Sequence, residues 1–361
     1  MQQYPKPYEM YGFWLRNQTL QREYGRGTTD GWQAHKACTS GKGYQNSSKS
    51  LCDAQTYPQP LYQDDFTATS AIKLLRRRDT SKPFFLHVSF PGPHPPFSVT
   101  AAMHDRVAKL GAWPNATDDP KAPSNLAAAC AGDHEPSNAH TRCDYAAELL
   151  NIDMLFQRVM DEVRAQGELD KTIVCMTSDH GELLGDHGDF DKSKPWQSSV
   201  GVPLVCAGPG ITPGKVVHAP VGTVDLAATF LDFAGATVPV GMTSRSMRQL
   251  LEPKATTPAT APPMPRTFVK SGLANWRLVV QVDPADGKSY KLICCQGQCP
   301  QAPSTAPKPN SKGFTRMLIA VDDDPYDMHD LSADKSMPTI LKRMLPLLPD
   351  KYAAGCSDSA Q

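Results

Sequence analysis

One long stretch of the chain carries apolar residues at helical spacing. Six of them recur at intervals of four, three, four, three and four residues, which places them on one face of an α-helix. The glycine at position 167 is of a type that commonly ends helices. The spacing therefore predicts an amphipathic helix over residues 145–166, whose apolar face is formed by Tyr145, Leu149, Ile152, Phe156, Val159 and Val163.

Short apolar runs on both sides of this helix are typical of buried strands. They read FFLHVSF at 84–90, TIVCMT at 172–177 and VPLVC at 202–206, and the first and last are followed by Gly and Pro residues. The order strand, helix, strand predicts an α/β fold with a mixed, mostly parallel sheet flanked by helices, in which 172–177 is central. Further helices are expected over 66–78 and 224–233.

A proline-rich segment divides the chain. Residues 253–265 hold five prolines in thirteen positions and no bulky core-forming residue, which is typical of a linker or an exposed loop. We therefore predict an α/β domain over residues 1–250, a linker over 251–265 and a small C-terminal subdomain over 266–361. In that subdomain the pattern predicts a small antiparallel sheet and a closing helix, with strands at 276–282 and 290–295 and the helix at 337–348.

Charge and hydropathy exclude several classes of protein. Lys plus Arg and Asp plus Glu each number 37, so the formal net charge is zero and no basic excess favours nucleic acid or an anionic membrane surface. No apolar run approaches the roughly 18 residues that a membrane helix needs. We expect neither a nucleic-acid partner nor a membrane span, and nothing in the pattern specifies an oligomeric state.

Cysteines and sequons favour the secretory pathway, extracellular or lysosomal. Ten cysteines are many for a cytosolic enzyme, and Asn17, Asn46 and Asn115 stand in glycosylation triplets within polar stretches. The first thirty residues hold no charged-then-apolar signal peptide. The expectation is therefore either that a signal has been removed or that the chain starts inside a longer protein.

Cysteine spacing gives three further expectations. Cys130 and Cys143 stand in loop-like sequence about a dozen residues apart and are predicted to pair. Cys175 lies in an apolar run and is expected to stay reduced as a small hydrophobic residue. The group Cys294, Cys295 and Cys299 allows a metal site or a loop disulfide, and three cysteines without a fourth ligand favour the disulfide.

A cluster of polar residues directly follows the 172–177 strand. Asp179 and His180 come first, at the kind of strand end where open α/β sheets place ligands. The carboxylate suits Ca²⁺ or Mg²⁺, and the imidazole shifts the preference toward Mn²⁺ or Zn²⁺. The alternative is an acidic, solvated surface loop, since further charged or titratable residues follow at Glu182, Asp186, His187, Asp189 and Asp191.

Three more side chains are candidates for anion chemistry. Prolines flank His94 on both sides, so its imidazole is predicted to be held rigidly after the 84–90 strand. His187 stands in a Gly-Asp-His-Gly segment, and Lys192 follows the acidic cluster and can neutralise an anionic group. Each histidine has a structural role as its alternative, and the alternative for Lys192 is a solvated cation.

These residues together resemble the sulfatases of the alkaline-phosphatase superfamily. The resemblance runs in family order from about residue 80 to residue 348, through the motifs Lys82-Pro83-Phe84-Phe85-Leu86, His94-Pro95-Pro96-Phe97, Thr177-Ser178-Asp179-His180-Gly181-Glu182, Gly185-Asp186-His187-Gly188, Lys192, Val202-Pro203-Leu204, Gly208-Pro209-Gly210, Val224-Asp225-Leu226-Ala227-Ala228-Thr229, Ala234-Gly235 and Asp324-Pro325-Tyr326-Asp327 with His329-Asp330-Leu331. It implies an alkaline-phosphatase-like fold and hydrolysis of sulfuric esters.

The resemblance also implies a role for each matching residue. Asp179 and His180 match metal ligands, with Ca²⁺ as the expected cation and Mn²⁺ or Mg²⁺ as alternatives. Lys192 and His94 match residues that contact the sulfate group, and the lysine also assists the leaving oxygen. His187 is expected to bind substrate. The resemblance implies a sulfated small molecule or glycan as the substrate. A divalent cation, an ammonium and an imidazolium can each stabilise the charge that develops on sulfate oxygens.

Two departures from the family pattern change the expectation. Gly201 stands where an arginine is common, which removes one substrate contact. No Cys or Ser stands in the Cys/Ser-x-Pro/Ala-x-Arg motif whose first residue becomes the formylglycine nucleophile in this family. The chain is thus expected to match the part downstream of that motif, as a fragment without its N-terminal portion, and not to turn over sulfate esters by itself at a useful rate.

Two other functions stay open at this point. A phosphodiesterase or phosphonate monoester hydrolase of the same superfamily shares the Ser-Asp-His-Gly and Gly-Asp-His segments. A secreted protein that binds sulfate or sulfated glycans without turnover would keep the same half of an anion site.

Overall fold

The computed structural model describes residues 63–94, 138–252, 266–300, 307–335 and 337–357, and the single positions 103, 106, 107 and 109. The chain divides into two compact units, Met1–Leu169 and Asp170–Gln361. The sequons at Asn17, Asn46 and Asn115 lie outside the described residues, as does most of the predicted 251–265 linker. The domain boundaries predicted from the sequence stay a prediction.

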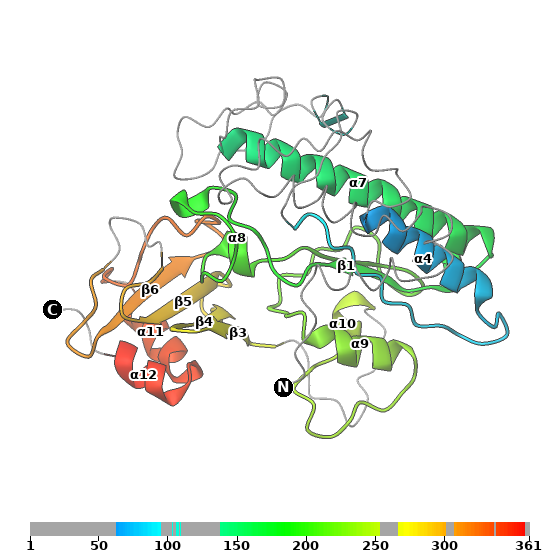
Figure 1. The fold of residues 1–361 in the computed structure, drawn as a ribbon. Coiled ribbons are helices and arrows are strands. Elements are labelled where there is room, and N and C mark those ends of the chain that lie inside the picture. Colours follow the sequence, from blue (N-terminus) through cyan, green and yellow to red (C-terminus); the bar gives the residue numbers. More distant parts are fainter. Residues whose placement is uncertain are drawn as a thin grey trace. The chain divides into compact units, whose positions relative to one another are not determined.

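Two packed helices organise the described part of the first unit. They are α4 (Gln63–Arg77) and α7 (Asn138–Ala165), and they run side by side in Figure 1. Acidic residues open α4 and arginines close it, which complements the helix dipole. Both predicted helices are confirmed. Their shared apolar core consists of Ala68, Ala71, Leu75, Leu155, Val159 and Val163.

Helix α7 begins seven residues before the predicted start at Tyr145. Its first turns bury the charged side chains Arg142, Asp144 and Glu148 beside the small apolar residues Cys143, Ala146 and Ala147. Apolar periodicity did not mark the start of the helix, because charged residues share its inward positions with small ones. The positive φ of Gly167, 71°, agrees with the predicted helix stop.

The strand predicted over 84–90 is wrong for the described part of the chain. The segment is extended, and its alternate residues Phe84, Leu86, Val88 and Phe90 pack against the α4–α7 core. Phe85, on the other face, is 73% exposed. The residue types predicted the extended conformation correctly. A strand also needs backbone hydrogen bonds to a neighbouring strand, and no described segment pairs with this one.

The second unit contains a two-stranded ribbon next to the predicted site. Strand β1 (Val174–Thr177) pairs antiparallel with β2 (Leu204–Ala207). The mostly parallel pairing expected from the sequence is therefore not found among the described strands, which pair antiparallel throughout. Residue type predicts where a strand lies, whereas its direction depends on how the intervening chain returns.

Cysteine pairing corrects one expectation and confirms another. Cys175 is not reduced, because it forms a disulfide with Cys206, which it directly faces across the ribbon. Apolar neighbours suggested a buried thiol, and only the pairing register brought the two Cα atoms to 4.1 Å. The loop disulfide Cys295–Cys299 is confirmed, and a further disulfide joins Cys294 to Cys356. Cys143 is disulfide-bonded, while Cys130, its predicted partner, lies outside the described residues.

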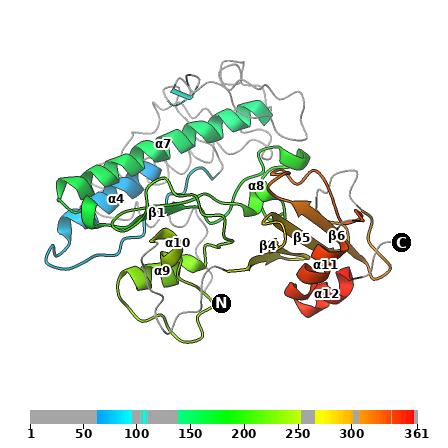
Figure 2. The same ribbon diagram turned by 180° about the vertical axis from the view of Figure 1, so that it is seen from behind.

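A four-stranded antiparallel sheet forms the C-terminal part of this unit. Its order is β3 (Phe268–Leu273), β4 (Trp276–Val282), β5 (Ser289–Gln296) and β6 (Phe314–Ala320). The two predicted strands are confirmed as β4 and β5. Two helices, α11 (Pro338–Met344) and α12 (Asp350–Cys356), cover one face of the sheet (Figure 2).

The closing helix predicted over 337–348 is shorter than expected. Helix α11 ends at Met344, a 3₁₀ turn follows over Leu345–Leu347, and α12 starts at Asp350. Pro346 and Pro349 lack the N–H that a continuous helix would need there. None of the described helices combines the length and the apolar character needed to cross a bilayer.

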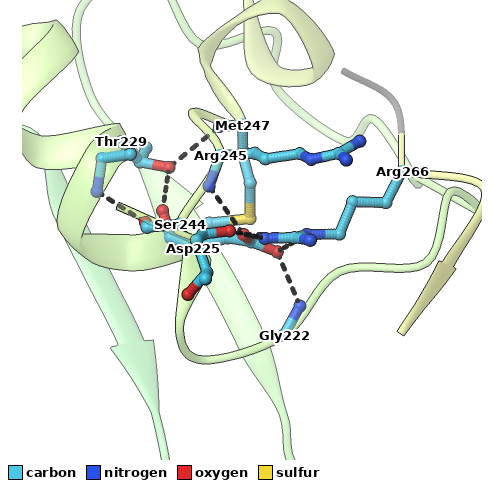
Figure 3. A network of polar contacts seen from close by, with 9 residues as sticks. Gly222, Asp225, Thr229, Ser244, Arg245, Met247 and Arg266 are labelled. Atoms are coloured by element: carbon cyan, nitrogen blue, oxygen red, sulfur yellow. Dashed lines mark hydrogen bonds and ion pairs between the residues drawn. The ribbon is translucent and has the colours of Figure 1, made fainter. Parts of the chain in front are cut away.

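A buried ion pair secures the helix that follows β2 along the chain. Asp225 opens α9 (Asp225–Phe233), is fully buried, and accepts hydrogen bonds from the Arg266 guanidinium at 2.5–2.9 Å (Figure 3). Gly222 and Arg245 donate backbone N–H groups to the same carboxylate. Arg266 directly follows the proline-rich segment, so this pair ties the chain beyond that segment to α9 and the short α10 (Arg248–Leu251) next to it.

Candidate functional site

The loop that connects β1 to α8 (Gln197–Val200) carries four of the five predicted site residues. We call residues 178–197 the site loop; it holds Asp179, His180, His187 and Lys192. The fifth residue, His94, belongs to the first unit. Its expected contact with the sulfate group stays a prediction.

Asp179 and His180 stand side by side at the open start of the site loop. The Asp179 side chain is 84% exposed and that of His180 39%, and His180 Nε2 lies 3.6 Å from Asp179 Oδ2. The backbone N–H of His180 donates to Asp179 Oδ1 at 2.9 Å, and His180 Nδ1 lies 2.9 Å from the Gly181 carbonyl oxygen. Both side chains are therefore oriented locally, with Nε2 and Oδ2 close together.

This pair fits part of a metal site. A carboxylate oxygen and an imidazole nitrogen at that separation can share one divalent cation, since each bond to it is about 2.0–2.6 Å long. Among the described residues no group of three His, Cys, Asp or Glu side chains could hold a metal. The described donors supply two ligands of the six to eight that Ca²⁺ takes.

The close approach of Gly181 to α8 explains why a glycine stands at this position. Its N–H donates to the Ser199 carbonyl at 2.9 Å, so the chain runs directly against α8. A Cβ at this position would clash with the backbone carbonyl of Ser198 and crowd that of Gly201. Because backbone cannot move aside like a flexible side chain, any larger residue would push Asp179 and His180 away from α8.

The middle of the site loop is closed by its own hydrogen bonds. Glu182 Oε1 accepts the N–H of Asp191 at 2.5 Å, and the N–H of Leu183 donates to the Asp191 carbonyl at 3.0 Å. Gly185 and Asp189 form a further bond of 2.8 Å inside this closure. Glu182 and Asp191, which the sequence suggested only as part of an acidic cluster, thus shape the loop.

Lys192 lies between two anchored backbone positions. On one side the Asp191 N–H is held by Glu182, and on the other the Ser193 carbonyl accepts the indole N–H of Trp276 at 2.9 Å. The Lys192 ammonium lies 2.8 Å from Asp191 Oδ1, with its side chain 24% exposed. The lysine is therefore a positioned, partly accessible cation and not a freely moving surface residue.

His187 is almost fully buried. Its ring stacks on Trp196 with centroids 4.4 Å apart, and its Nε2 lies 2.9 Å from the Tyr326 carbonyl oxygen. The residue adopts a left-handed conformation, with φ 57°. This geometry supports the loop from within; the substrate-binding role expected from the sequence stays a prediction.

Beneath the site loop lies the face of the four-stranded sheet that α11 and α12 do not cover. Leu183 and Trp196 of the loop are fully buried in one apolar cluster with residues of β4, β5 and β6. These sheet residues are Trp276, Leu278, Ile293, Cys295, Met317 and Ile319. Burial of two large side chains of the loop, at about 1.5–3 kcal/mol each, fixes it to the sheet.

One fully buried ion pair stands in this apolar layer. Lys291 of β5 donates from Nζ to Asp327 Oδ2 at 2.5 Å and to Gln197 Oε1 at 3.1 Å. The Gln197 N–H donates to the same Asp327 oxygen at 2.5 Å. Burial lowers the pKa of Lys291 and raises the pKa of Asp327, while the charge of each partner opposes the shift of the other.

The sequence analysis assigned no role to Lys291, Trp276 or Gln197. Lys291 did leave a signal, because it interrupts an otherwise apolar strand on the face that points to Ile293 and Cys295. A lysine at such a position is costly unless it is paired. Its partner could not be named, since Asp327 lies 36 residues further along the chain.

His94 in the first unit follows a turn that Asp64 holds. The Gly92 N–H donates to Asp64 Oδ1 at 3.1 Å, and the His94 N–H donates to the Pro91 carbonyl at 3.2 Å. A Cβ on Gly92 would lie 2.7 Å from Asp64 Oδ2 and 3.2 Å from Ile152 Cδ1, so the turn is packed between α4 and α7. Burial, more than the nearby Asp65 charge, raises the pKa of Asp64 to about 6. His94 itself is exposed.

Comparison with known proteins shows which family the chain resembles. The sulfatase family model matches residues 8–236. An arylsulfatase of Clostridium perfringens is 29% identical over 212 residues, which cover 56% of this chain and 44% of that protein. An N-acetylglucosamine-6-O-sulfatase of Bacteroides thetaiotaomicron is 40% identical over 117 residues, or 32% of this chain and 21% of the relative. The chain spans less than half the length of these curated relatives.

Solved structures show the same fold. A protein solved with its substrate D-glucosamine-2-N,6-O-disulfate matches with a TM-score of 0.62 at 21% identity, over 82% of this chain and 71% of the other. A phosphonate monoester hydrolase of Agrobacterium radiobacter matches with a TM-score of 0.58 at 20% identity, over 93% and 67%. The predicted fold class, an alkaline-phosphatase-like α/β fold with a small C-terminal antiparallel sheet and helix, is confirmed, although the mostly parallel pairing is not found among the described strands. With the family model matched over well more than half of its residues, the chain belongs to the sulfatase family.

Proposed function

We propose that the protein is a sulfuric ester hydrolase and that the site loop is the sulfate-facing part of its active site. The observation that carries this proposal is that Asp179 and His180, a pair able to share a cation, lie on the same anchored loop as Lys192. His94 is proposed as the second catalytic residue, and His187 as a contributor to substrate binding. Family membership supports these assignments.

Hydrolysis of a sulfate ester is assisted by positive charge at two places, the leaving oxygen and the non-bridging oxygens. Breaking the S–O bond of a sulfate ester leaves the bonding electron pair on the leaving oxygen, while the non-bridging oxygens stay negative. The Lys192 ammonium can donate a hydrogen bond or a proton to the leaving oxygen. The imidazole of His94 can donate to a sulfate oxygen, and the turn that Asp64 holds restricts the backbone from which that ring projects.

Asp179 and His180 are the residues proposed to hold a divalent cation, with Ca²⁺ as first choice and Mn²⁺ or Mg²⁺ as alternatives. When bound, such a cation supplies Lewis-acid stabilisation of sulfate oxygens. The formylglycine nucleophile of the family needs a sequence motif that the printed chain does not contain. We therefore expect this chain to bind sulfated ligands and not to turn them over rapidly.

The proposed substrate is a sulfated glycan, and the proposed compartment is the secretory pathway. One solved neighbour carries a sulfated glucosamine as its substrate, and a matching relative in Drosophila melanogaster is described as an extracellular sulfatase homologue. Three disulfides join described cysteines, which agrees with an oxidising compartment. N-glycosylation at Asn17, Asn46 and Asn115 belongs to the same proposal.

Calorimetric titration tests the proposed site directly. The 361-residue chain is titrated with D-glucosamine 6-sulfate and with unsulfated D-glucosamine, with and without CaCl₂. We expect calcium-dependent binding of the sulfated sugar alone, weakened about tenfold in Lys192→Met because a charge-assisted hydrogen bond is lost. Lys194→Met is the matched control, since Lys194 pairs with Asp189 and is similarly exposed.

Equal binding of both sugars, or unchanged binding in Lys192→Met, would overturn the proposal. The phosphonate hydrolase alternative is decided in the same experiment by phenylphosphonate, which would then bind more tightly than phenyl sulfate. An assay with p-nitrophenyl sulfate accompanies the titration. Calcium-dependent turnover that Asp179→Ala abolishes would show that the chain contains a nucleophile outside the family motif.

A further inference from the structure

We propose that the buried Lys291–Asp327 ion pair is a positioning device for the site loop, by which the C-terminal sheet fixes the segment that carries His187 and Lys192. The inference rests on the proposed function, because it concerns how Lys192 meets a sulfated ligand. It assigns a role in the site to two residues that touch neither the ligand nor the cation.

The contacts of the pair reach the end of the site loop. Both side chains are fully buried, and one oxygen of Asp327 receives the Lys291 ammonium and the Gln197 N–H, each at 2.5 Å. Lys291 also donates to the Gln197 side-chain oxygen. The pair therefore joins the middle strand β5 to the first residue of α8, where the loop ends.

The residue next to Asp327 holds the other arm of the loop. The Tyr326 carbonyl oxygen lies 2.9 Å from His187 Nε2, and His187 stacks on Trp196, which precedes Gln197. One dipeptide thus contacts the loop before and after Lys192. Trp276 of β4 also donates to the Ser193 carbonyl, so residues of the C-terminal part of the unit hold the loop at His187, before the lysine, and at Ser193 and Gln197, after it.

Stability alone gives little reason for this pair. Apolar residues of similar volume often replace a buried ion pair without loss of stability, because desolvation offsets the attraction between the charges. Asp327 Oδ1 is buried with no hydrogen-bond donor among the described residues, so the carboxylate is only partly satisfied. Asp327 also has a positive φ of 59°, a conformation that is uncommon outside glycine. A directional tie to the loop explains why this arrangement is present.

A double-substitution cycle separates positioning from stability. Lys291→Met leaves a buried, unpaired carboxylate, whereas Lys291→Met combined with Asp327→Asn removes both charges and keeps an acceptor for the Gln197 N–H. Asparagine also tolerates the positive φ. We expect the double variant to melt close to the wild-type temperature, with binding of D-glucosamine 6-sulfate about tenfold weaker and amide exchange over residues 183–197 faster.

The exposed pair Lys288–Asp323, which joins the residue before β5 to the turn after β6, supplies the matched control. Lys288→Met is expected to change neither the affinity nor the exchange of the loop. A double variant with restored melting temperature and wild-type affinity and exchange would overturn the positioning role. If the wild-type chain binds no sulfated sugar, the proposed function fails, and the exchange of residues 183–197 still decides whether the pair holds the loop.

Discussion

The start of the site loop and the sheet beneath it hold charged residues by opposite means. Asp179 and His180 form an exposed rim, oriented by short hydrogen bonds to neighbouring backbone. Lys291 and Asp327 form a buried floor, held by each other and by Gln197. Solvent can stabilise the rim charges when no cation is bound, but each floor charge depends on its partner. The comparison predicts that rim substitutions change binding with little effect on stability, whereas removal of one floor charge lowers stability.

Lys291→Met is expected to have the largest effect on stability. It leaves the Asp327 carboxylate buried and uncompensated, which lowers the free energy of unfolding by about 3–5 kcal/mol. Urea denaturation of the 361-residue chain, followed by far-ultraviolet circular dichroism, measures the loss. Most of it should return when Asp327→Asn is added. A loss below about 1 kcal/mol in the single variant would contradict the dependence of the floor on its own pairing.

Asp64 extends the comparison to the first unit. It is a buried carboxylate, and burial is the main cause of its pKa shift. Its pKa is raised from 3.8 to about 6 by burial, so the folded chain binds more protons than the unfolded chain between these values. The free energy of unfolding should therefore fall by about 3 kcal/mol as pH rises from about 4 to above 6.

Asp64→Asn removes this titration and keeps an oxygen for the Gly92 N–H. Its stability should match that of the wild type near pH 4 and exceed it at pH 7, as measured by urea denaturation across this range. Because other groups titrate equally in both chains, the difference between them isolates Asp64. A difference that does not vary with pH would contradict the raised pKa.

Trp276→Phe should have a smaller effect that is confined to the loop. The substitution removes the indole donor to the Ser193 carbonyl and leaves most of the apolar contact, at a cost of about 1–2 kcal/mol. Amide exchange is expected to become faster around Lys192 and to stay unchanged in β5 and β6. Equal acceleration throughout the sheet would show that Trp276 acts on the core and not on the loop.

Asp179→Asn should have the smallest effect on stability and a clear effect on binding. Its side chain is 84% exposed, so the free energy of unfolding should change by no more than about 0.5 kcal/mol. Calcium-dependent binding of D-glucosamine 6-sulfate is expected to be lost, because a ligand charge is removed. A variant that binds the sugar normally would exclude Asp179 from the cation site.

The sequence predicted the local features of this protein well. Helical spacing located α7, apolar runs located β1, β4 and β5, and several motifs in family order, from about residue 80 to residue 348, identified the family. These features depend on neighbours within a few residues, through periodicity, turn chemistry and the donor atoms that a cation needs. The unusual position of Lys291, a cation inside an apolar strand, is also visible in the sequence.

Tertiary structure alone decided which segments meet. It made β1 and β2 antiparallel, brought Cys175 opposite Cys206 and left residues 84–90 without a described partner strand. It also joined Lys291 to Asp327 across 36 positions and placed both under the site loop. Backbone hydrogen bonds, disulfides and buried ion pairs form between whichever groups the packed chain brings into contact. For this reason the residue types predicted the chemistry of the site, whereas only the fold showed which contacts hold the site loop in place.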